Sequence, residues 1–135
     1  MNYREKNAET ISRWVEKGWI WGTEIDHETF VRAKNGEWDV VLTPIKSVPK
    51  SWFGDLKGKK VLGLSSAGGQ QMPILTAAGA HCTVFDICDS MLEKDRLVSK
   101  REGISIEIVK GDITESLPFE DECFDLIFYP VSNCY

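Results

Sequence analysis

Residues 60–86 of the chain read KVLGLSSAGGQQMPILTAAGAHCTVFD, and the order of residue types in this stretch decides the fold. The apolar run of residues 60–64 is typical of a buried strand, and a loop of small residues, 65–69, follows it. Residues 70–78 then fit a helix, and the apolar run of residues 82–85 fits a second strand. Strand, helix and strand in this order predict a right-handed crossover between parallel strands.

The sequence that follows continues this alternation. A helix is predicted from Ser90, because Glu93 is placed to complete a capping box with it. Apolar residues alternate over 104–108 as they do in a strand, and residues 124–129, FDLIFY, fit a fourth strand. We therefore expect an α/β fold over residues 59–135, with a Rossmann-like parallel sheet and flanking helices.

Residues 1–58 differ from the rest because they are irregular and rich in tryptophan. Short helices are predicted before Gly18 and between Asp26 and Gly36, where Asp26 is a good N-cap. We interpret this helical segment as a cap on the sheet. Its tryptophans fit packing between cap and sheet, and the alternative is an apolar wall of a substrate pocket. They are Trp14, Trp19, Trp21, Trp38 and Trp52.

Composition restricts the partners of the chain. Its 135 residues carry a formal net charge of -5, which disfavours a nucleic-acid partner. The apolar runs are too short to span a bilayer and the charged N-terminus lacks the apolar core of a signal peptide, so we expect no membrane partner and a cytoplasmic location. The four cysteines form no CxxC pair and no metal-ligand spacing with either histidine, so we expect reduced thiols and no metal site.

The loop after the first strand is the first candidate for a ligand site. In an open parallel sheet, ligands bind beyond the carboxyl ends of the strands where the strand order reverses. Small side chains at 65–69 let a ligand approach the backbone, and the amides that open the next helix favour a negative group. The alternative is a tight strand-to-helix turn with no ligand.

Two acids follow later strands at corresponding places. Asp86 ends the second strand, 21 positions after Ser65, where a carboxylate can accept hydrogen bonds from both hydroxyls of a ribose. Its alternative role is to cap the helix that follows. Asp112 ends the third strand, where it can accept the exocyclic amine of an adenine, or serve as an ordinary turn residue.

A dinucleotide cofactor fits the loop less well than a nucleoside with a compact charged tail. The dinucleotide fingerprint GxGxxG needs its second glycine for close approach of a pyrophosphate, and the loop here reads Ser65-x-Ala67-x-Gly69. The sequence also lacks GxxxxGK[ST], which argues against a nucleoside triphosphatase.

Two stretches carry a family resemblance. VLGLSSAGGQQMPILTAAGAHCTVFDICDSML and KGDITESLPFEDECFDLIFYPVSN resemble, in order, the four motifs of class I S-adenosylmethionine-dependent methyltransferases. The LPF…FDLI wording is similar to small-molecule methyltransferases of the type 11 kind. The resemblance implies S-adenosyl-L-methionine as the cofactor and methyl transfer to an unidentified small molecule. The alternative is a module that binds this cofactor or another nucleoside without turnover.

The resemblance also implies roles for individual residues. The cofactor-binding set is Gly63, Ser65, Ser66, Ala67, Gly68, Gly69 and Gln70 around the methionine part, Asp86 at the ribose, Ile87 and Met91 beside the base, and Asp112 and Ile113 at the adenine. The expected substrate side consists of Tyr129, Pro130 and Asn133. The family has an acid at the position of Gly63, which helps fix the loop and the amino group of the cofactor. No general base stands out, since His27 and His81 are candidates by residue type alone.

The family sheet has seven strands and four are counted here, so we expect a sheet that is incomplete at its C-terminal side. The fourth strand would then be an edge strand, and exposed edges invite pairing with another chain. We expect this edge to be covered by a second copy, by a completing chain, or by the N-terminal segment.

Overall fold

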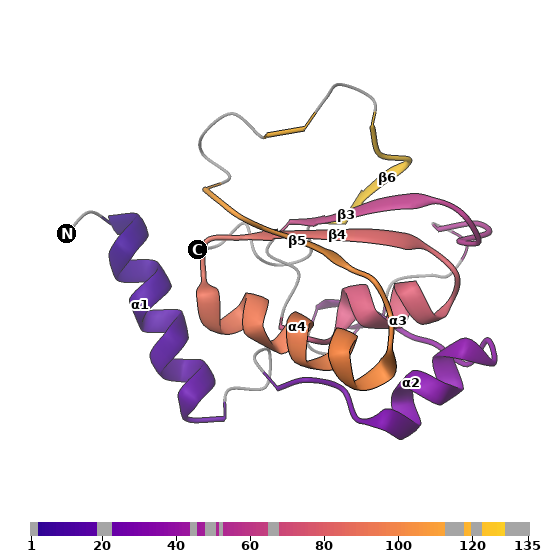
Figure 1. The fold of residues 1–135 in the computed structure, drawn as a ribbon, viewed down its shortest axis with the longest axis horizontal. Coiled ribbons are helices and arrows are strands. Elements are labelled where there is room, and N and C mark those ends of the chain that lie inside the picture. Colours follow the sequence, from indigo (N-terminus) through magenta and orange to yellow (C-terminus); the bar gives the residue numbers. More distant parts are fainter. Residues whose placement is uncertain are drawn as a thin grey trace.

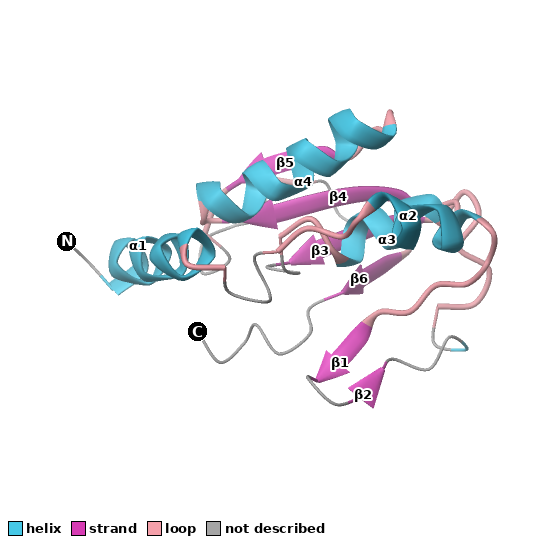
Figure 2. Cartoon of the chain, turned by 90° about the horizontal axis from the view of Figure 1, so that it is seen from below, coloured by secondary structure: helices cyan, strands magenta, loops and turns pink. Residues whose placement is uncertain are grey.

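The computed structural model describes residues 3–18, 23–43, 46–47, 51, 53–64, 68–112, 118–119 and 123–128. These residues form a four-stranded parallel sheet with helices packed on one face (Figure 1), and a separate two-stranded antiparallel ribbon (Figure 2). The elements in chain order are α1 (Tyr3–Glu16), α2 (His27–Lys34), β1 (Val41–Thr43), β2 (Lys46–Ser47), β3 (Lys60–Leu64), α3 (Gln71–Ala77), β4 (His81–Asp86), α4 (Asp89–Glu102), β5 (Glu107–Lys110) and β6 (Leu126–Phe128). The predicted α/β class with a Rossmann-like parallel sheet is confirmed.

Strand β3 lies inside the sheet, whose order is β5-β4-β3-β6. It pairs in parallel with β4 on one side, where Gly63 lies opposite Val84, and with β6 on the other, where Gly63 lies opposite Phe128. The chain runs outward from β3 to β5 and returns to the far side of β3 for β6. The strand order therefore reverses beside β3, and the carboxyl ends there form the switch point at which open α/β sheets bind ligands.

The core lies between the sheet and helices α3 and α4, and α2 packs against α3 (Figures 1 and 2). Val61 and Val84 of the sheet are buried in one apolar cluster with Leu75 of α3 and Leu92 of α4. These side chains share a layer because the apolar face of each helix must be removed from water. Helices α3 and α4 therefore bury one face of the sheet.

Aromatic side chains of the segment before β3 pack against this core. Phe53 makes edge-to-face contacts with Trp38 and with Phe128 of β6, each with ring centroids 5.6 Å apart. Trp38 therefore packs against the core as expected. Trp14 does not, because it is 40% exposed while its neighbour Val15 is buried near α4. Trp19, Trp21 and Trp52 lie outside the described residues.

The start of α4 corrects one expectation. Ser90 and Glu93 do not form a capping box: the N-cap is Cys88, whose side chain makes no capping hydrogen bond, and Glu93 is ion-paired with Arg96 instead. The Oδ1 atom of Asp86 accepts the backbone N–H of Cys88 at 2.9 Å. The strand-end carboxylate therefore holds the turn into α4, and Ser90 lies inside the helix.

The face of the sheet opposite the helices is covered by no helix among the described residues. Phe119 packs on it against Phe85 of β4 and Phe124, with ring centroids 5.9 and 5.1 Å apart. On β6, the outer strand of the described sheet, the side chain of Ile127 is 57% exposed. The expected edge strand is thus present, and its cover by another chain or by the N-terminal segment stays a prediction.

Two further sequence-based expectations concern helices and thiols. No helix in the described part of the chain is long and apolar enough to cross a bilayer. Of the described cysteines, Cys82 and Cys88 are buried, Cys123 is half-buried, and all three are outside disulfides.

We predict that Gly111→Ala destabilises the fold, because an added Cβ would lie 2.4 Å from Cζ of the buried Phe85 ring. Overpacking of this kind costs about 1–3 kcal/mol of unfolding free energy, which urea denaturation measures. In the double variant Phe85→Leu/Gly111→Ala the smaller side chain makes room, so the loss should be less than the sum of the two single losses. Additive losses would contradict the steric explanation.

Candidate functional site

The carboxyl ends of β4 and β5 bring two acids to one edge of the sheet. Asp86 is paired with Lys110 in the parallel register, and the backbone N–H of Gly111 donates to the carbonyl oxygen of Asp86 at 3.0 Å. Asp112 follows directly. The two predicted nucleoside-binding acids therefore lie side by side at the end of the sheet where β3 also ends.

The carboxyl group of Asp86 is buried, with 8% of the residue exposed. Burial raises its pKa to about 6, although backbone N–H groups of Cys88 and Ile87 that donate to it act in the opposite direction. The helix-capping role weighed from the sequence is thus real. It leaves acceptor capacity, because an ionised carboxylate has about four lone-pair sites.

The two described glycines of the loop after β3 are packed tightly on α4. A Cβ at Gly68 would lie 3.2 Å from Sδ of Met91, and one at Gly69 would lie 2.9 Å from the carbonyl oxygen of Lys94. Gly69 also has a φ of +68°, which few other residues adopt, and its N–H donates to Oδ1 of Asp95 at 3.1 Å. Gly69 therefore serves the packing of the loop. Ser65, Ser66 and Ala67 lie outside the described residues.

Asp95 is a residue of the site that sequence reasoning missed. It is 2% exposed, and burial raises its pKa well above the usual range for an aspartate. From α4 it holds the loop by accepting the Gly69 amide. The signal in the sequence is its helical spacing with Met91, Leu92 and Val98, which places an acid on the apolar face of the helix.

The glutamine pair after the loop divides into two environments. Nε2 of Gln70 donates to the carbonyl oxygen of Thr23 at 2.6 Å, so Gln70 ties the loop to the N-terminal segment. Gln71, which sequence reasoning passed over, is 3% exposed at the start of α3. Its Oε1 atom is buried without a hydrogen-bond partner in the part of the chain that the structure describes.

Helix α1 lies beyond the carboxyl ends of β4 and β5 (Figure 2). Nε of Arg4 is 2.8 Å from Oδ2 of Asp112, and Oγ of Ser12 is 3.4 Å from Sγ of Cys88. Val15 packs with Cys88 and Met91 in a small apolar cluster. The helix therefore contacts the residues predicted to surround the adenine, of which Ile113 lies outside the described residues.

Neither histidine is near these acids. His81 is the first residue of β4, five positions before Asp86, and is exposed. Nδ1 of His27 lies 2.6 Å from Oε1 of Glu102, at the end of α4 about 20 Å from its start. Neither side chain is placed to act as a base at this edge of the sheet. The predicted substrate side, Tyr129, Pro130 and Asn133, lies outside the described residues.

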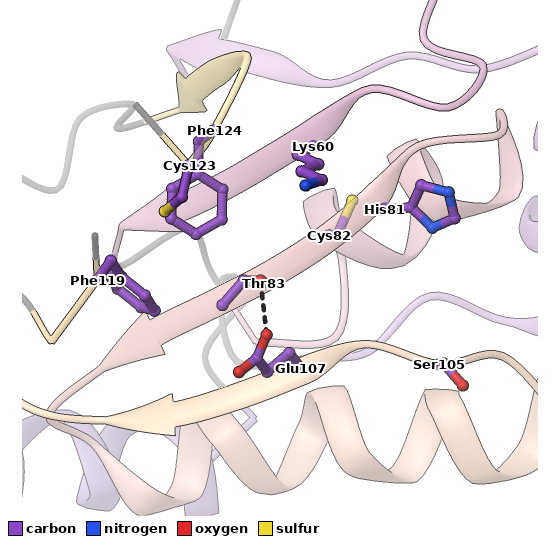
Figure 3. A pocket seen from close by; sticks show the side chains of 9 residues that line it. All are labelled: Lys60, His81, Cys82, Thr83, Ser105, Glu107, Phe119, Cys123 and Phe124. Carbon is purple, nitrogen blue, oxygen red and sulfur yellow. Dashed lines mark hydrogen bonds between the residues drawn. The ribbon is translucent and has the colours of Figure 1, made fainter. Parts of the chain in front are cut away.

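A cavity of about 410 Å³ lies on the other face of the sheet (Figure 3). Its lining residues are Lys60, His81, Cys82, Thr83, Ser105, Glu107, Phe119, Cys123 and Phe124. Thr83 Oγ1 donates to Glu107 Oε2 at 3.4 Å within it. Lys60, His81 and Glu107 are the first residues of their strands, so this hollow is separate from the strand ends that carry Asp86 and Asp112.

Comparison with known proteins agrees with this geometry. Residues 62–135 match the family model described as methyltransferase domain. The chain is 43% identical over 129 residues to the protein named uncharacterized methyltransferase YbaJ of Bacillus subtilis (strain 168). The chain therefore belongs to this methyltransferase family. The alignment covers 96% of this chain and 51% of the relative, so the chain spans about half the length of that curated relative.

One solved structure in particular has a similar fold. A protein-L-isoaspartate O-methyltransferase superimposes with a TM-score of 0.50 at 20% identity, covering 93% of this chain and 47% of that one. A mutein of the branched-chain polyamine synthase of Thermus thermophilus, solved with 5'-methylthioadenosine, gives a TM-score of 0.43 at 22% identity, covering 87% and 34% of the two chains.

We predict a pH dependence of stability from the raised pKa of Asp86. An unfolded aspartate ionises near pH 4, whereas folded Asp86 keeps its proton to about pH 6, so stability falls as the pH rises between these values. Asp86→Asn retains an Oδ1 acceptor and cannot ionise. It should therefore be more stable than the wild type at pH 7 by about 1–3 kcal/mol, and similar to it near pH 4.

Chemical denaturation at several pH values measures this effect. The exposed Asp55, whose Oδ1 also accepts a backbone amide, supplies the matched control Asp55→Asn. The charge of Asp86 also raises the pKa of Asp95, so the difference between the wild-type and Asp86→Asn curves includes the loss of this coupling. Parallel curves for wild type and Asp86→Asn would rule out the raised pKa.

Proposed function

We propose that this chain binds S-adenosyl-L-methionine and forms the cofactor-binding half of a methyltransferase that acts on a small-molecule acceptor. The observation that carries the proposal is the burial of Asp86 at the end of β4, beside Asp112. A buried carboxylate is costly unless donors reach it, and the two hydroxyls of a ribose are such donors. The backbone N–H groups at the turn into α4 use part of the acceptor capacity of Asp86, and the remaining lone pairs can accept the ribose hydroxyls.

The surroundings of the two acids fit an adenosine. Asp112 is an acceptor for the exocyclic amine of the base. Ile87 follows Asp86, and Met91 lies four positions later with only 6% of its surface exposed, so the pair supplies an apolar flank for a ring. Gly68 and Gly69 let the loop after β3 pack closely on α4, and we assign the methionine part of the cofactor to this loop.

The chemistry then divides between cofactor and protein. When bound, the cofactor supplies a methyl group activated on a sulfonium, which needs no general base of the protein for its reactivity. The residues of this chain orient it, and alignment of donor with acceptor supplies much of the acceleration in such transfers. Ile11 and Val15 of α1, packed near Met91, exclude water from the nucleoside side. The net charge of -5 supports a small-molecule acceptor over a nucleic acid.

Calorimetric titration with S-adenosylhomocysteine tests the proposal. We expect the wild type to bind it and Asp86→Asn to bind about 5- to 150-fold more weakly, because each lost hydrogen bond to a charged group is worth about 1–3 kcal/mol. The control is Asp55→Asn, which should bind as the wild type does. An absence of wild-type binding would refute the cofactor, and an unchanged Asp86→Asn would refute the ribose contact alone.

Two further measurements distinguish a methyltransferase from a dinucleotide-binding protein and from a nucleoside-binding module without turnover. NADH should not compete with S-adenosylhomocysteine, since the loop lacks the second glycine of the dinucleotide fingerprint. Cofactor binding without methyl transfer to any acceptor would favour a nucleoside-binding module without turnover.

A second prediction follows from the contact of α1 with Asp112. Arg4→Ala removes the cation that occupies this carboxylate, so adenine no longer has to displace it. Because Arg4 is one-third exposed, the pair is worth at most about 1 kcal/mol, and S-adenosylhomocysteine should bind up to about fivefold more tightly. Added salt should tighten wild-type binding in the same way and leave Arg4→Ala unaffected.

Arg13→Ala on the same helix is the control, because Arg13 contacts Thr10 and is exposed. Weaker binding in Arg4→Ala would show that Arg4 assists the ligand and does not compete with it.

A further inference from the structure

Gln71 carries a buried acceptor for which the protein supplies no donor among the described residues. The side chain belongs to the first residue of α3 and is 3% exposed, and its Oε1 atom has no hydrogen-bond partner there. Buried polar atoms in native proteins are nearly always hydrogen-bonded, because an unpaired one has lost its bonds to water without replacement. An exception of this kind points to a donor that is not part of the chain.

The position of Gln71 in the fold identifies where that donor would lie. Its helix begins directly after the small-residue loop, at the carboxyl end of β3. Gly63 on β3 is paired with Val84 and Phe128, which belong to the apolar cluster that α3 covers. A side chain at position 63 would face this layer from the sheet, and Gln71 lies one helical turn before Leu75, which is buried in the same cluster.

Position 63 lacks the acidic side chain that the family resemblance implies. The family resemblance puts an acid there, which helps hold the amino group of the cofactor, and this chain has a glycine that offers no acceptor. Gln70 is already held by the carbonyl oxygen of Thr23. Gln71 therefore places, at the start of α3, a buried acceptor that has no donor among the described residues, and an ammonium group would supply that donor.

We infer that Oε1 of Gln71 accepts a hydrogen bond from the ammonium group of the cofactor's methionine part, in place of the missing acid at position 63. This inference rests on the proposed function, since it names a residue of the same site. An ammonium has three donors and no acceptor, so it is matched by a carbonyl oxygen. Gln71 is a binding residue for the amino-acid end and is independent of the adenosine contacts.

The test compares two ligands that differ at that end. S-adenosylhomocysteine carries the ammonium, and 5'-methylthioadenosine lacks the amino-acid part but keeps the adenosine. Gln71→Met preserves length and removes the acceptor, so it should weaken S-adenosylhomocysteine about tenfold or more and leave 5'-methylthioadenosine within about twofold. The control Asp55→Asn, at an exposed residue outside the site, should leave the ratio of the two dissociation constants unchanged.

The melting temperature of the ligand-free protein gives an independent readout. Gln71→Met should raise the Tm, because an apolar group replaces an unpaired acceptor. Gln71→Glu retains an acceptor and adds charge, so it should increase the preference for S-adenosylhomocysteine over 5'-methylthioadenosine. This second variant decides the matter if Gln71→Met does not fold.

The outcomes separate the inference from the proposed function. A wild type that binds neither ligand overturns the proposed function. A wild type that binds both, with an unchanged ratio in Gln71→Met and Gln71→Glu, overturns the role of Gln71 alone. A lowered Tm with equal weakening of both ligands in Gln71→Met would likewise overturn it, since that result marks a structural side chain.

Discussion

The pairing of β3 with a parallel strand on each side is the constraint on which the rest of the structure depends. Backbone hydrogen bonds fix the register, so that the last residues of β3, β4 and β5 end at one edge of the sheet. Side chains alternate between faces along a strand, and a slip of one residue would move Asp86 from one face to the other. The two acids are neighbours because this register holds.

Buried carboxyl groups then organise the loops at that edge. Asp86 holds the turn into α4, and Asp95 on the same helix holds the loop after β3 through the Gly69 amide. Both are desolvated, and burial raises the pKa of each. Polar groups in such an environment stabilise a defined local geometry more than the fold as a whole, which is typical of a binding site.

The sequence predicted the elements of the sheet well, since apolar runs and glycines mark their ends. The strand over residues 60–64 was predicted with its observed bounds, and the helix and strand after it differ by about one residue at their ends. The predicted capping of α4 is wrong because the sequence does not show which side chain lies within hydrogen-bond distance of the free amides at the start of the helix. Ser90 is a favoured capping residue type, but it is Asp86 that accepts the backbone N–H of Cys88.

The polar residues of the site were harder to predict than the fold. Asp86 and Asp112 could be found because they follow strands, and parallel strands end together. Asp95 and Gln71 were missed, since the burial of a polar side chain within a helix is decided by its tertiary neighbours. The contact of Arg4 with Asp112 joins opposite ends of the sequence and has no local signal.

The placement of β6 beside β3 has a consequence for how the fold assembles. The residues from β3 to β5 pair through two short crossovers, whereas the bond from the Lys60 amide to Asp125 joins positions 65 residues apart. Closing a longer loop costs more chain entropy before any contact compensates for it. The three-stranded unit is therefore expected to form first and β6 to dock last, so the switch point is completed only at the end of folding.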